Sequence, residues 1–373
     1  SFHEVDGQHG RIRALQKIDE ERFQIHTQSP DPLLLAKLSF FLIFPKDTSF
    51  EEAATPVGTG PYAVEKNEHG TLALQLFDEY WGSLPEFERV ALKTILSKEE
   101  KKEVLKNRSI DILANLPADI ATNFQYRGYL LQSLPSLEVN FLMFHFERGF
   151  RNRSLRQAAR LALNTTQLGR LAQGFSVPAT QFVGDGIFGF DPSISLPDRD
   201  LVQARELVQE ISKGAPVKVT LDLPKGLETF GANVVQQLNR VGIEVTARFH
   251  TPEALGRLIT SRGSEFFFFG WRSELGDASD FLTAVVHSPS QGFGQFNGGN
   301  YRRSEVDQLI ELSQATLRQD LRLEKLRTVM RKITVDDVIG IPLFSPEVLY
   351  GVSRKLQFKP RVDGYVLAQE VKL

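Results

Sequence analysis

The hydrophobic residues follow different periods in the two parts of the chain. In residues 71–76, TLALQL, every second residue is leucine, which is the period of a half-buried strand. Residues 12–19 and 22–27 also favour extended structure. The apolar run LLLAKLSFF at 33–41 follows a turn and predicts a short buried helix. The first third is therefore predicted to be rich in strands.

From about residue 139 the chain alternates between strand-like and helical segments. The segment VNFLMFHF at 139–146 predicts a buried strand, and apolar residues on one face predict a helix over 155–173, with Asn152 or Ser154 as its cap. Strands separated by helices of this length predict an α/β lobe. The later segments are predicted as helix 200–211, strand 217–223, helix 228–241, strand 244–250, helix 252–260, strand 265–271, helices 304–316 and 317–333, and strands within 339–352.

The segment PVGTGPYAVEK at 56–66 contains Gly58, Gly60 and Ala63 at the G-x-G-x-x-A spacing of a dinucleotide-binding fingerprint. That fingerprint needs a buried strand before it and a helix after it, whereas here a polar segment comes before and the strand at 71–76 comes after. No Gly-Lys-Ser/Thr follows, so a Walker loop is excluded as well. The glycines are predicted to set the turn at the entry to a hairpin.

Composition limits the classes of protein that fit. With 373 residues the chain exceeds the roughly 250–300 at which one core stops growing, so two lobes or domains are expected. A hydrophobic content of 41% and a charged content of 24% are ordinary for a globular protein. The net charge of −2 argues against nucleic acid as a partner of this segment. The longest apolar run, at 33–44, is interrupted by Lys37 and is too short to span a bilayer.

The absence of cysteine and the start of the chain bear on location. No cysteine occurs, which removes disulfides, thiol catalysis and Cys-based metal sites, and suits an oxidising compartment. The chain opens with the polar segment SFHEVDGQHGR and without Met, and no signal peptide is visible in it. We therefore expect a processed or truncated start.

The residues do not argue for catalysis. The motifs G-x-S-x-G and H-E-x-x-H, and paired acids beside a lone His, do not occur in a supporting context. The histidines are scattered without ligand spacing, so a metal site built on them is not favoured. His145 lies in an apolar strand, where a core histidine is favoured over a ligand contact. We expect no enzyme activity, no cofactor and no bound metal.

Four segments resemble one family in the same order. They are PVGTGPY with the strand and the segment DEYWGSLPEFERV that follow it, FLMFHFERGFRNRSLRQAARLAL at 141–163, FFFFGWRSELGDASDFL at 266–282, and NYRRSEVDQLIELSQATLRQDLRLEKLRTVMRKI at 300–333. Together they resemble the bacterial extracytoplasmic solute-binding proteins of family 5, which serve peptide, dipeptide and nickel ABC transporters. The resemblance covers nearly the whole chain.

The chain departs from the family pattern at single positions and at its start. The family usually has Asn where His145 stands, Asp where Asn164 stands and often Pro where Ala278 stands. Family members also carry a long segment before the part that corresponds to residue 1. A fragment is therefore expected in preference to a shortened relative.

The resemblance implies an α/β fold of the periplasmic-binding-protein type II, a two-lobed venus-flytrap clamp that closes around its ligand, with the first lobe incomplete. Lobe I would combine residues 1–138 with 346–373, and lobe II would be the α/β stretch 139–345.

Two crossover segments would join these lobes, near Val139–Phe144 and Ile341–Val348. His145 directly follows the first segment and Phe344 lies in the second. Both residues are therefore candidates for a hinge role or for lining the cleft.

A peptide-binding cleft has to recognise what all peptides share, the main chain and its charged ends. A carboxylate that faces the ligand ammonium gives a charge-assisted hydrogen bond. In the family an acidic residue shortly after a Gly-Trp pair has this role, and the matching position is Glu274. Gly270, Trp271, Arg272 and Ser273 would offer backbone groups to the ligand, and Trp271 would also form a wall of a side-chain pocket.

Plainer alternatives exist for each of these residues. Glu274 is otherwise a solvated carboxylate in a loop, and Trp271 is otherwise a core residue that follows a buried strand. Asp277 and Asp280 are most simply helix-capping or surface acids. Arg156 is expected to support its own helix and the packing around it.

The resemblance therefore predicts the solute-binding component of an ABC importer. Its ligand would be an oligopeptide or a small cationic solute, its partner an ABC-transporter permease, and it would act as a monomer. It would be periplasmic or extracytoplasmic, with a lipid anchor on a preceding segment. The alternative is the solute-sensing domain of a cytoplasmic transcriptional regulator, with a winged-helix domain before residue 1.

Overall fold

The protein forms two compact units in the computed structural model, which describes residues 12–45, 56–290 and 292–373. The larger unit contains Leu137–Pro346 and the segment that ends at Lys37, and the smaller unit contains Leu38–Ser136 and Glu347–Leu373. The predicted lobes, residues 1–138 with 346–373 and residues 139–345, stay a prediction.

The larger unit is built on a mixed sheet. Its strands are β8 (Glu138–Phe144), β9 (Ser176–Pro178), β10 (Val217–Pro224), β11 (Ile243–His250), β12 (Phe266–Arg272) and β13 (Gly340–Ser353). The order is β11-β10-β12-β8-β13, and the short β9 also pairs with β13. β10 is parallel to β11 and β12, as expected for strands joined by helices, whereas β8 is antiparallel to β12 and β13.

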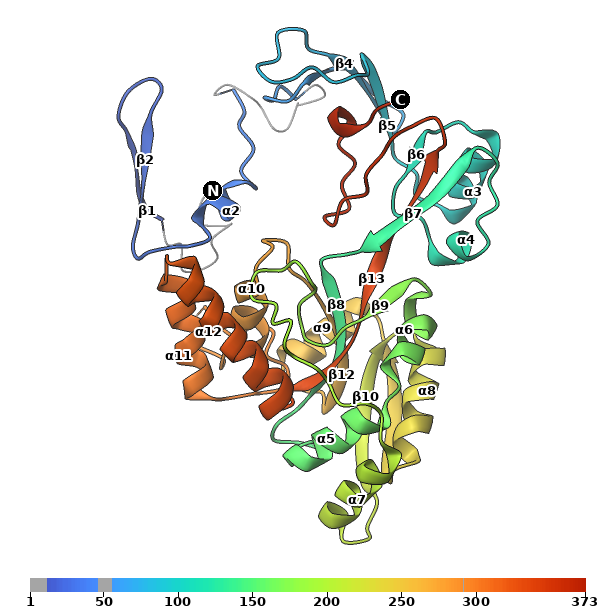
Figure 1. Ribbon diagram of the computed structural model, residues 1–373, viewed down its shortest axis with the longest axis vertical. Coiled ribbons are helices and arrows are strands. Elements are labelled where there is room, and N and C mark those ends of the chain that lie inside the picture. Colours follow the sequence, from blue (N-terminus) through green and yellow to red (C-terminus); the bar gives the residue numbers. More distant parts are fainter. Residues whose placement is uncertain (1–11, 46–55, 291) are drawn as a thin grey trace. The chain divides into compact units, whose positions relative to one another are not determined.

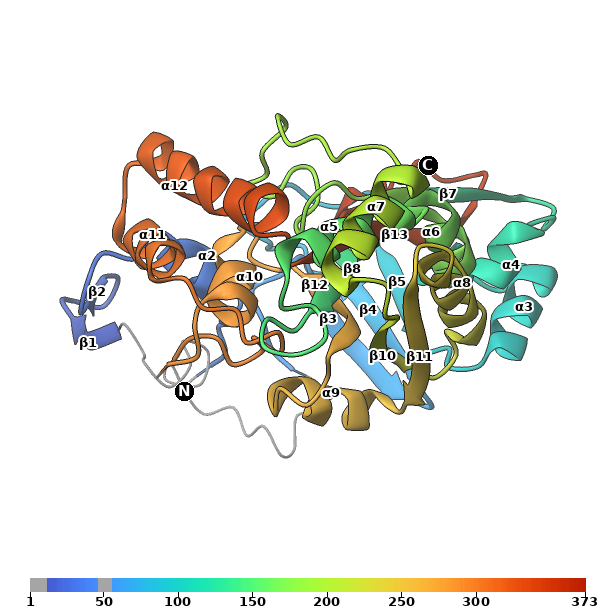
Figure 2. The ribbon, with the colours of Figure 1, turned by 90° about the horizontal axis from the view of Figure 1, so that it is seen from below.

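Helices cover both faces of this sheet, as Figures 1 and 2 show. One layer contains α5 (Arg153–Ala162), α6 (Thr165–Gln173), α7 (Leu201–Ser212) and α8 (Glu228–Asn239). The other contains α9 (Pro252–Thr260), α10 (Ser279–Phe281), η2 (Leu282–Val286), α11 (Ser304–Ala315), α12 (Gln319–Arg331) and η3 (Lys332–Asp336). The predicted alternation of helices and strands between 200 and 271 is confirmed.

The sheet separates two hydrophobic cores because successive side chains of a strand point to opposite faces. In β8, Leu142 and Phe144 belong to the core with α5 to α8, whereas Phe141 and Met143 belong to the core with α9 to α12. All four side chains are at most 1% exposed. The strand predicted as buried at 139–146 is therefore confirmed.

The single helix predicted over 155–173 is wrong, because the chain forms α5 and α6 with a break between them. Leu163 is extended, with φ −88° and ψ 136°. The Asn164 side chain accepts a hydrogen bond from the Gln167 amide over 2.9 Å and caps α6. An Asn side chain competes for backbone groups in this way, which favours a helix start over a helix interior.

The smaller unit contains short elements and one separate sheet. The sheet consists of β3 (Tyr62–Glu68), β4 (Thr71–Leu76) and β5 (Arg89–Lys93), all antiparallel. The predicted hairpin at 62–76 is confirmed. The other elements are α3 (Lys98–Asn107), β6 (Ile112–Leu113), α4 (Ala118–Thr122), β7 (Tyr129–Pro135) and η4 (Ala368–Glu370), and both β6 and β7 pair with the last part of β13.

Gly58 and Gly60 do not need to be glycine for the reason predicted. A Cβ atom at either position would meet nothing within 4 Å, and neither residue has a positive φ. The hairpin turn instead uses His69 and Gly70, with φ of 50° and 73°. Two successive positive φ values are typical of the tight turn that joins twisted strands.

The segment before the smaller sheet is less buried than its composition predicts. It contains the hairpin of β1 (Ile12–Lys17) and β2 (Phe23–Thr27) and the short helix α2 (Leu34–Leu38). The predicted burial of residues 33–41 is wrong, since α2 has no buried side chain and Leu35 is 82% exposed. Apolar side chains are not all buried in folded proteins, and a five-residue helix has little area to cover them.

Candidate functional site

The C-terminal half of β12 has an edge that no strand covers among the described residues. β12 pairs with β8 along its whole length but with β10 only at its first two residues. The Ser273 amide donates to the Leu137 carbonyl over 3.1 Å, which fixes the alternation of the antiparallel ladder. The backbone groups of Gly270 therefore point away from β8, toward the uncovered edge.

Gly270 permits a close approach of side chains from the neighbouring strand. A Cβ atom there would lie 2.7 Å from Asn140 Oδ1 and 2.9 Å from Glu138 Oε1. These two side chains are held together, because Asn140 Nδ2 donates to Glu138 Oε1 over 2.9 Å. The glycine thus allows two polar side chains of β8 to lie against the backbone of β12.

Trp271 lies at the margin of the core formed with α9 to α12. Its ring centroid is 5.9 Å from that of Phe296, 6.3 Å from that of Phe281 and 6.4 Å from that of Phe269. The side chain is nevertheless only half-buried. Trp271 therefore packs against the core on one side and remains partly accessible, which is compatible with both predicted roles.

Glu274 lies in the exposed turn that follows β12. Its side chain is 65% exposed, and its carboxylate lies 3.8 Å from Arg272 Nε. The Glu274 amide donates to the Arg272 carbonyl over 3.0 Å, and the Gly276 amide donates to the Ser273 carbonyl over 3.0 Å. The predicted role of Glu274 toward a ligand ammonium stays a prediction.

Asp277 is a buried anion and not a surface acid, so that part of the expectation is wrong. Arg322 of α12 donates two hydrogen bonds to its carboxylate, over 2.5 and 2.8 Å, and both side chains are at most 5% exposed. Asp277 also accepts from the Ser279 amide over 2.9 Å, but the residue that caps α10 is Ala278, which makes no side-chain capping bond. The sequence did not predict this ion pair because the two residues are 45 positions apart.

Asp280 lies in the first turn of α10, is half-buried, and accepts a hydrogen bond from the Phe281 amide. Burial raises the pKa of its carboxyl to about 7, and the neighbouring Asp277 acts in the same direction. The Phe281 amide and the side chains of Trp271 and Ser273 lower this pKa. Phe281 and most residues of η2 are buried. An acidic residue directly before such an apolar segment is the feature of the sequence that could have indicated a partly buried carboxyl.

The two crossover candidates lie in the interior of the larger unit. Burial is the main cause that lowers the pKa of His145, followed by the charge of Arg148, and its Nδ1 accepts from the Glu147 amide over 3.1 Å. These contacts match the core histidine that the sequence favours. Phe344 is 1% exposed and packs in the core with α5 to α8. Their roles in a hinge or cleft stay predictions.

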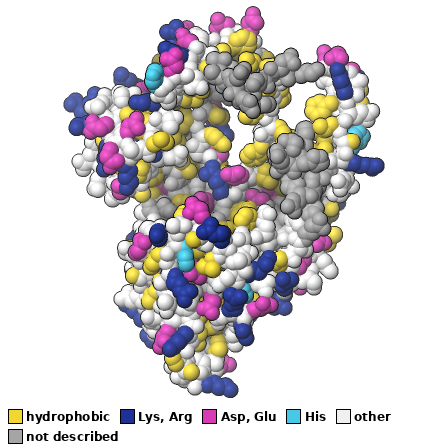
Figure 3. All heavy atoms as spheres, turned by 180° about the vertical axis from the view of Figure 1, so that it is seen from behind, with side chains coloured by type: hydrophobic (Ala, Val, Ile, Leu, Met, Phe, Trp, Pro, Cys, Tyr) yellow, Lys and Arg dark blue, Asp and Glu magenta, His cyan; other side chains and the backbone are white. Residues whose placement is uncertain are grey.

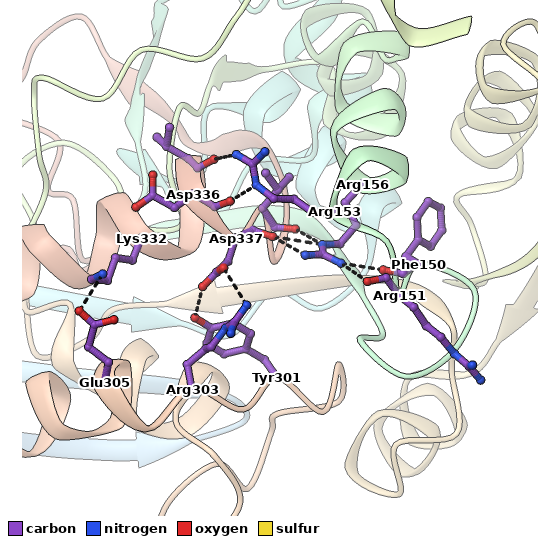
Figure 4. A network of polar contacts seen from close by, with 12 residues as sticks. Phe150, Arg151, Arg153, Arg156, Tyr301, Arg303, Glu305, Lys332, Asp336 and Asp337 are labelled. Atoms are coloured by element: carbon purple, nitrogen blue, oxygen red, sulfur yellow. Dashed lines mark hydrogen bonds and ion pairs between the residues drawn. The ribbon is translucent and has the colours of Figure 1, made fainter. Parts of the chain in front are cut away.

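Arg156 supports its own helix, as predicted, and joins it to the end of η3 (Figure 4). Burial lowers the pKa of its guanidinium to about 10. The Asp337 carboxylate, which accepts from Tyr301 over 2.6 Å and lies 3.4 Å from Arg303, opposes this shift. The guanidinium donates over 2.8–3.1 Å to the backbone carbonyls of Phe150, Arg151, Asp337 and Val338.

Other classes of site find little support in the described part of the chain. No group of three or more His, Cys, Asp or Glu side chains there could hold a metal ion. No described helix combines the length and the apolar character needed to cross a bilayer. On the face in Figure 3, basic and acidic side chains are interspersed over the described surface.

Comparison with known proteins identifies the family. The sequence matches the bacterial extracellular solute-binding proteins, family 5 middle, over residues 4–293. The glutathione-binding protein GsiB of Pectobacterium atrosepticum is 26% identical, and the alignment covers 68% of this chain and 51% of that protein. A dipeptide-binding protein of Escherichia coli is 22% identical, with 95% of this chain and 69% of that protein covered. The chain thus spans about half the length of GsiB.

Solved structures share the fold. The structure of HbpA2 from Haemophilus parasuis superposes with a TM-score of 0.87 at 16% identity, and covers 97% of this chain and 75% of that one. The predicted α/β fold of a two-lobed periplasmic binding protein is thereby confirmed. Since the family match extends over most of the sequence, the chain belongs to the bacterial extracellular solute-binding proteins of family 5.

Proposed function

We propose that this protein is the solute-binding component of an ABC importer and that its ligand is a short peptide or a similar cationic solute. The family match and the names of the relatives support this proposal. Glutathione and dipeptides, for which two relatives are named, both contain a peptide bond and a charged ammonium group. A binding site for such ligands needs backbone hydrogen bonds and an anionic partner.

The observation that carries the proposal is the uncovered edge of β12. The backbone groups of Gly270 point to this edge, where an extended peptide can pair as an added strand. Trp271 lies next to Gly270 in β12, and the acidic residues Glu274 and Asp280 follow within the next ten residues of the sequence. An extended peptide with a free ammonium group fits this combination.

We assign the ligand contacts accordingly. The backbone from Gly270 to Ser273 pairs with the ligand main chain, Trp271 forms a wall against a ligand side chain, and a carboxylate after β12 meets the ammonium group, with Glu274 as the candidate taken from the sequence. His145 and Phe344 belong to segments that move or line the cleft when the ligand binds.

The remaining parts of the proposal follow from the same role. The protein acts without catalysis and without a cofactor, as a monomer that delivers its ligand to an ABC-transporter permease. Its place is the periplasm or another extracytoplasmic location, and a lipid anchor on a preceding segment would hold it at the membrane.

Titration calorimetry on the full-length protein tests this function. A pool of di- to pentapeptides should give saturable heat, and nickel ions alone should give none. Trp271→Ala should weaken peptide binding about tenfold, whereas Trp81→Ala, at an 82% exposed tryptophan of the smaller unit, should leave it unchanged. If the peptide pool gives no heat, the peptide proposal is wrong, and heat from nickel alone would favour a metal ligand.

A further inference from the structure

Arg160 of α5 is a buried cation whose charge is not compensated by the residues that the structure describes. Its side chain is 9% exposed, and its Nη1 donates to the Thr334 carbonyl over 3.1 Å. Its Nε is buried and has no hydrogen-bond partner. The described residues give Arg160 no ion pair with a carboxylate, and the charged side chain that acts on it is another cation, Arg153.

The two other buried arginines of the described chain have the partners that Arg160 lacks. Arg322 donates to both carboxylate oxygens of Asp277. Arg156, one turn before Arg160 in α5, donates to four backbone carbonyls, and the nearby Asp337 carboxylate raises its pKa against the effect of burial. A buried cation without a counter-charge destabilises a fold, so Arg160 needs an explanation of its own.

The hydroxyl of Thr334 is a second unsatisfied group at the same place. Thr334 lies in the π-helix η3, is 1% exposed, and its Oγ1 has no hydrogen-bond partner. In α-helices a threonine hydroxyl can donate to the carbonyl four residues earlier, as Thr328 does to Glu324 over 2.8 Å. In η3 the backbone hydrogen bonds run five residues back, and Thr334 Oγ1 does not make such a contact.

The surroundings of Arg160 disfavour its positive charge. Burial lowers the pKa of its guanidinium, and the charge of Arg153 acts in the same direction. Arg153 is exposed, lies two turns earlier in α5 and donates to the Asp336 carbonyl of η3 (Figure 4). The contact between α5 and η3 therefore brings together two guanidinium groups and a hydroxyl, and all of them can act as donors.

We propose that Arg160 and Thr334 form a binding site for one small monovalent inorganic anion, such as chloride. Arg160 Nε and Thr334 Oγ1 donate hydrogen bonds to the anion, and the charge of Arg153 adds to the attraction. A guanidinium has no acceptor, so only an acceptor can complete its hydrogen bonds. A water molecule would accept these bonds, but only an anion also compensates the buried charge.

The setting of the site defines the class of anion. Both side chains are at least nine-tenths buried, so a large anion does not fit without displacing its neighbours. A second negative charge would be as costly to bury as the unpaired cation is now. The bound anion would link α5 to η3, which leads into β13. This site thus serves the stability of the larger unit and is independent of the proposed peptide ligand.

Thermal unfolding of the full-length protein, in chloride and in gluconate at equal ionic strength, tests the site. Chloride should raise the unfolding temperature by about 2–4 °C, because the larger gluconate does not enter. Arg160→Met should lose this rise, and in gluconate it should unfold at the same temperature as the unmodified protein or higher. The matched control is Arg327→Met in α12, a half-buried arginine whose Nε donates to the Phe190 carbonyl over 3.0 Å, and it should keep the rise.

Two further measurements keep the inference testable if Arg160→Met does not fold. Thr334→Val preserves the shape of the side chain without its hydroxyl, and should reduce the chloride effect to roughly half. Crystals of the unmodified protein grown in bromide should contain an anomalous scatterer beside Arg160 Nε and Thr334 Oγ1.

Three results would overturn the inference. They are a chloride effect in Arg160→Met equal to that of the unmodified protein, an equal effect of chloride and gluconate on the unmodified protein, and a water molecule without bromide at Arg160 in the crystals. None of these measurements involves a peptide, so the anion site and the proposed function stand or fail separately.

Discussion

The sheet of the larger unit and the β3–β4–β5 sheet of the smaller unit are stabilised in different ways. In the larger unit helices cover both faces, and side chains such as Phe141 and Leu221 are 0% exposed. In the β3–β4–β5 sheet every residue of β4 is only half-buried, and β5 contains no buried side chain. The first sheet is held by burial on both faces, while the second depends mainly on its own ladder and turns.

This difference bears on where binding chemistry can be held in place. The candidate ligand segment continues β12, whose side chains alternate between two cores, so its backbone has a fixed register. Desolvated polar groups such as those of Asp277 and Asp280 also need a closed surrounding, which the larger unit provides. The half-open sheet of the smaller unit contains no comparable buried acid among its described residues.

The largest expected contrast comes from removing one side chain in each sheet. Phe141→Ala should lower the unfolding free energy of the larger unit by about 3–5 kcal/mol, because it leaves a cavity in a closed core. Leu74→Ala in β4 should cost about 1 kcal/mol or less, since that side chain is half-exposed already. Denaturant unfolding, followed by the fluorescence of Trp271 for the larger unit and of Trp81 for the smaller unit, measures the two effects separately. Equal losses of unfolding free energy in the two variants would contradict the comparison.

Breaking the buried ion pair should have the next largest effect. Arg322→Met leaves the Asp277 carboxylate buried without its cation, and should destabilise the larger unit by about 3 kcal/mol. The control is Arg318→Met, one turn earlier, whose partner Asp320 is 63% exposed, and whose loss should cost about 0.5 kcal/mol or less. Thermal unfolding of both variants measures the difference. If the two variants unfold at the same temperature, the Asp277–Arg322 ion pair is not buried as described.

The Asp280 carboxyl should make the larger unit less stable as pH rises. Its pKa in the folded protein is about 7, above the ordinary value of 3.8, so the folded state binds more protons than the unfolded state between these values. Stability contributed by the protonated form is complete below pH 4 and is lost as pH increases to 7, by about 1.4 kcal/mol for each pH unit between the two pKa values. Asp280→Asn should flatten this part of the stability profile. A profile with the same slope in the variant would refute the assignment.

The smallest effect is expected at the break between α5 and α6. Asn164→Ala removes the side chain that caps α6 and should cost about 1 kcal/mol. Asn164→Asp keeps a capping oxygen and should cost little. Urea unfolding of both variants measures this, and equal costs would argue against capping as the reason for the break.

The sequence predicted most elements because each carries local information. The helices at 200–260, the strands between them and the hairpin at 62–76 follow from periods and turn residues that need no distant contact. The break at Leu163 was missed because a capping side chain within an otherwise apolar helical pattern is a weak signal. Burial of α2 was predicted from composition alone, which does not say whether anything covers an apolar helix.

The site was less predictable because its chemistry depends on contacts across the fold. The segment Gly270–Glu274 was found through family resemblance, but the sequence did not indicate that Asp277 pairs with Arg322 or that Asp280 is desolvated. Nor does spacing reveal that the ladder between β10 and β12 ends after two residues. Only the structure shows which of these side chains are buried and which residues from distant segments of the chain pair with each other.

The central claim is that a free ammonium group is recognised at the end of β12. Calorimetry of the full-length protein with one peptide pool, before and after acetylation of its amino termini, tests that claim most directly. The account predicts saturable heat with the free pool and at least about a tenfold weaker response with the acetylated pool. Equal binding of the two pools would contradict it.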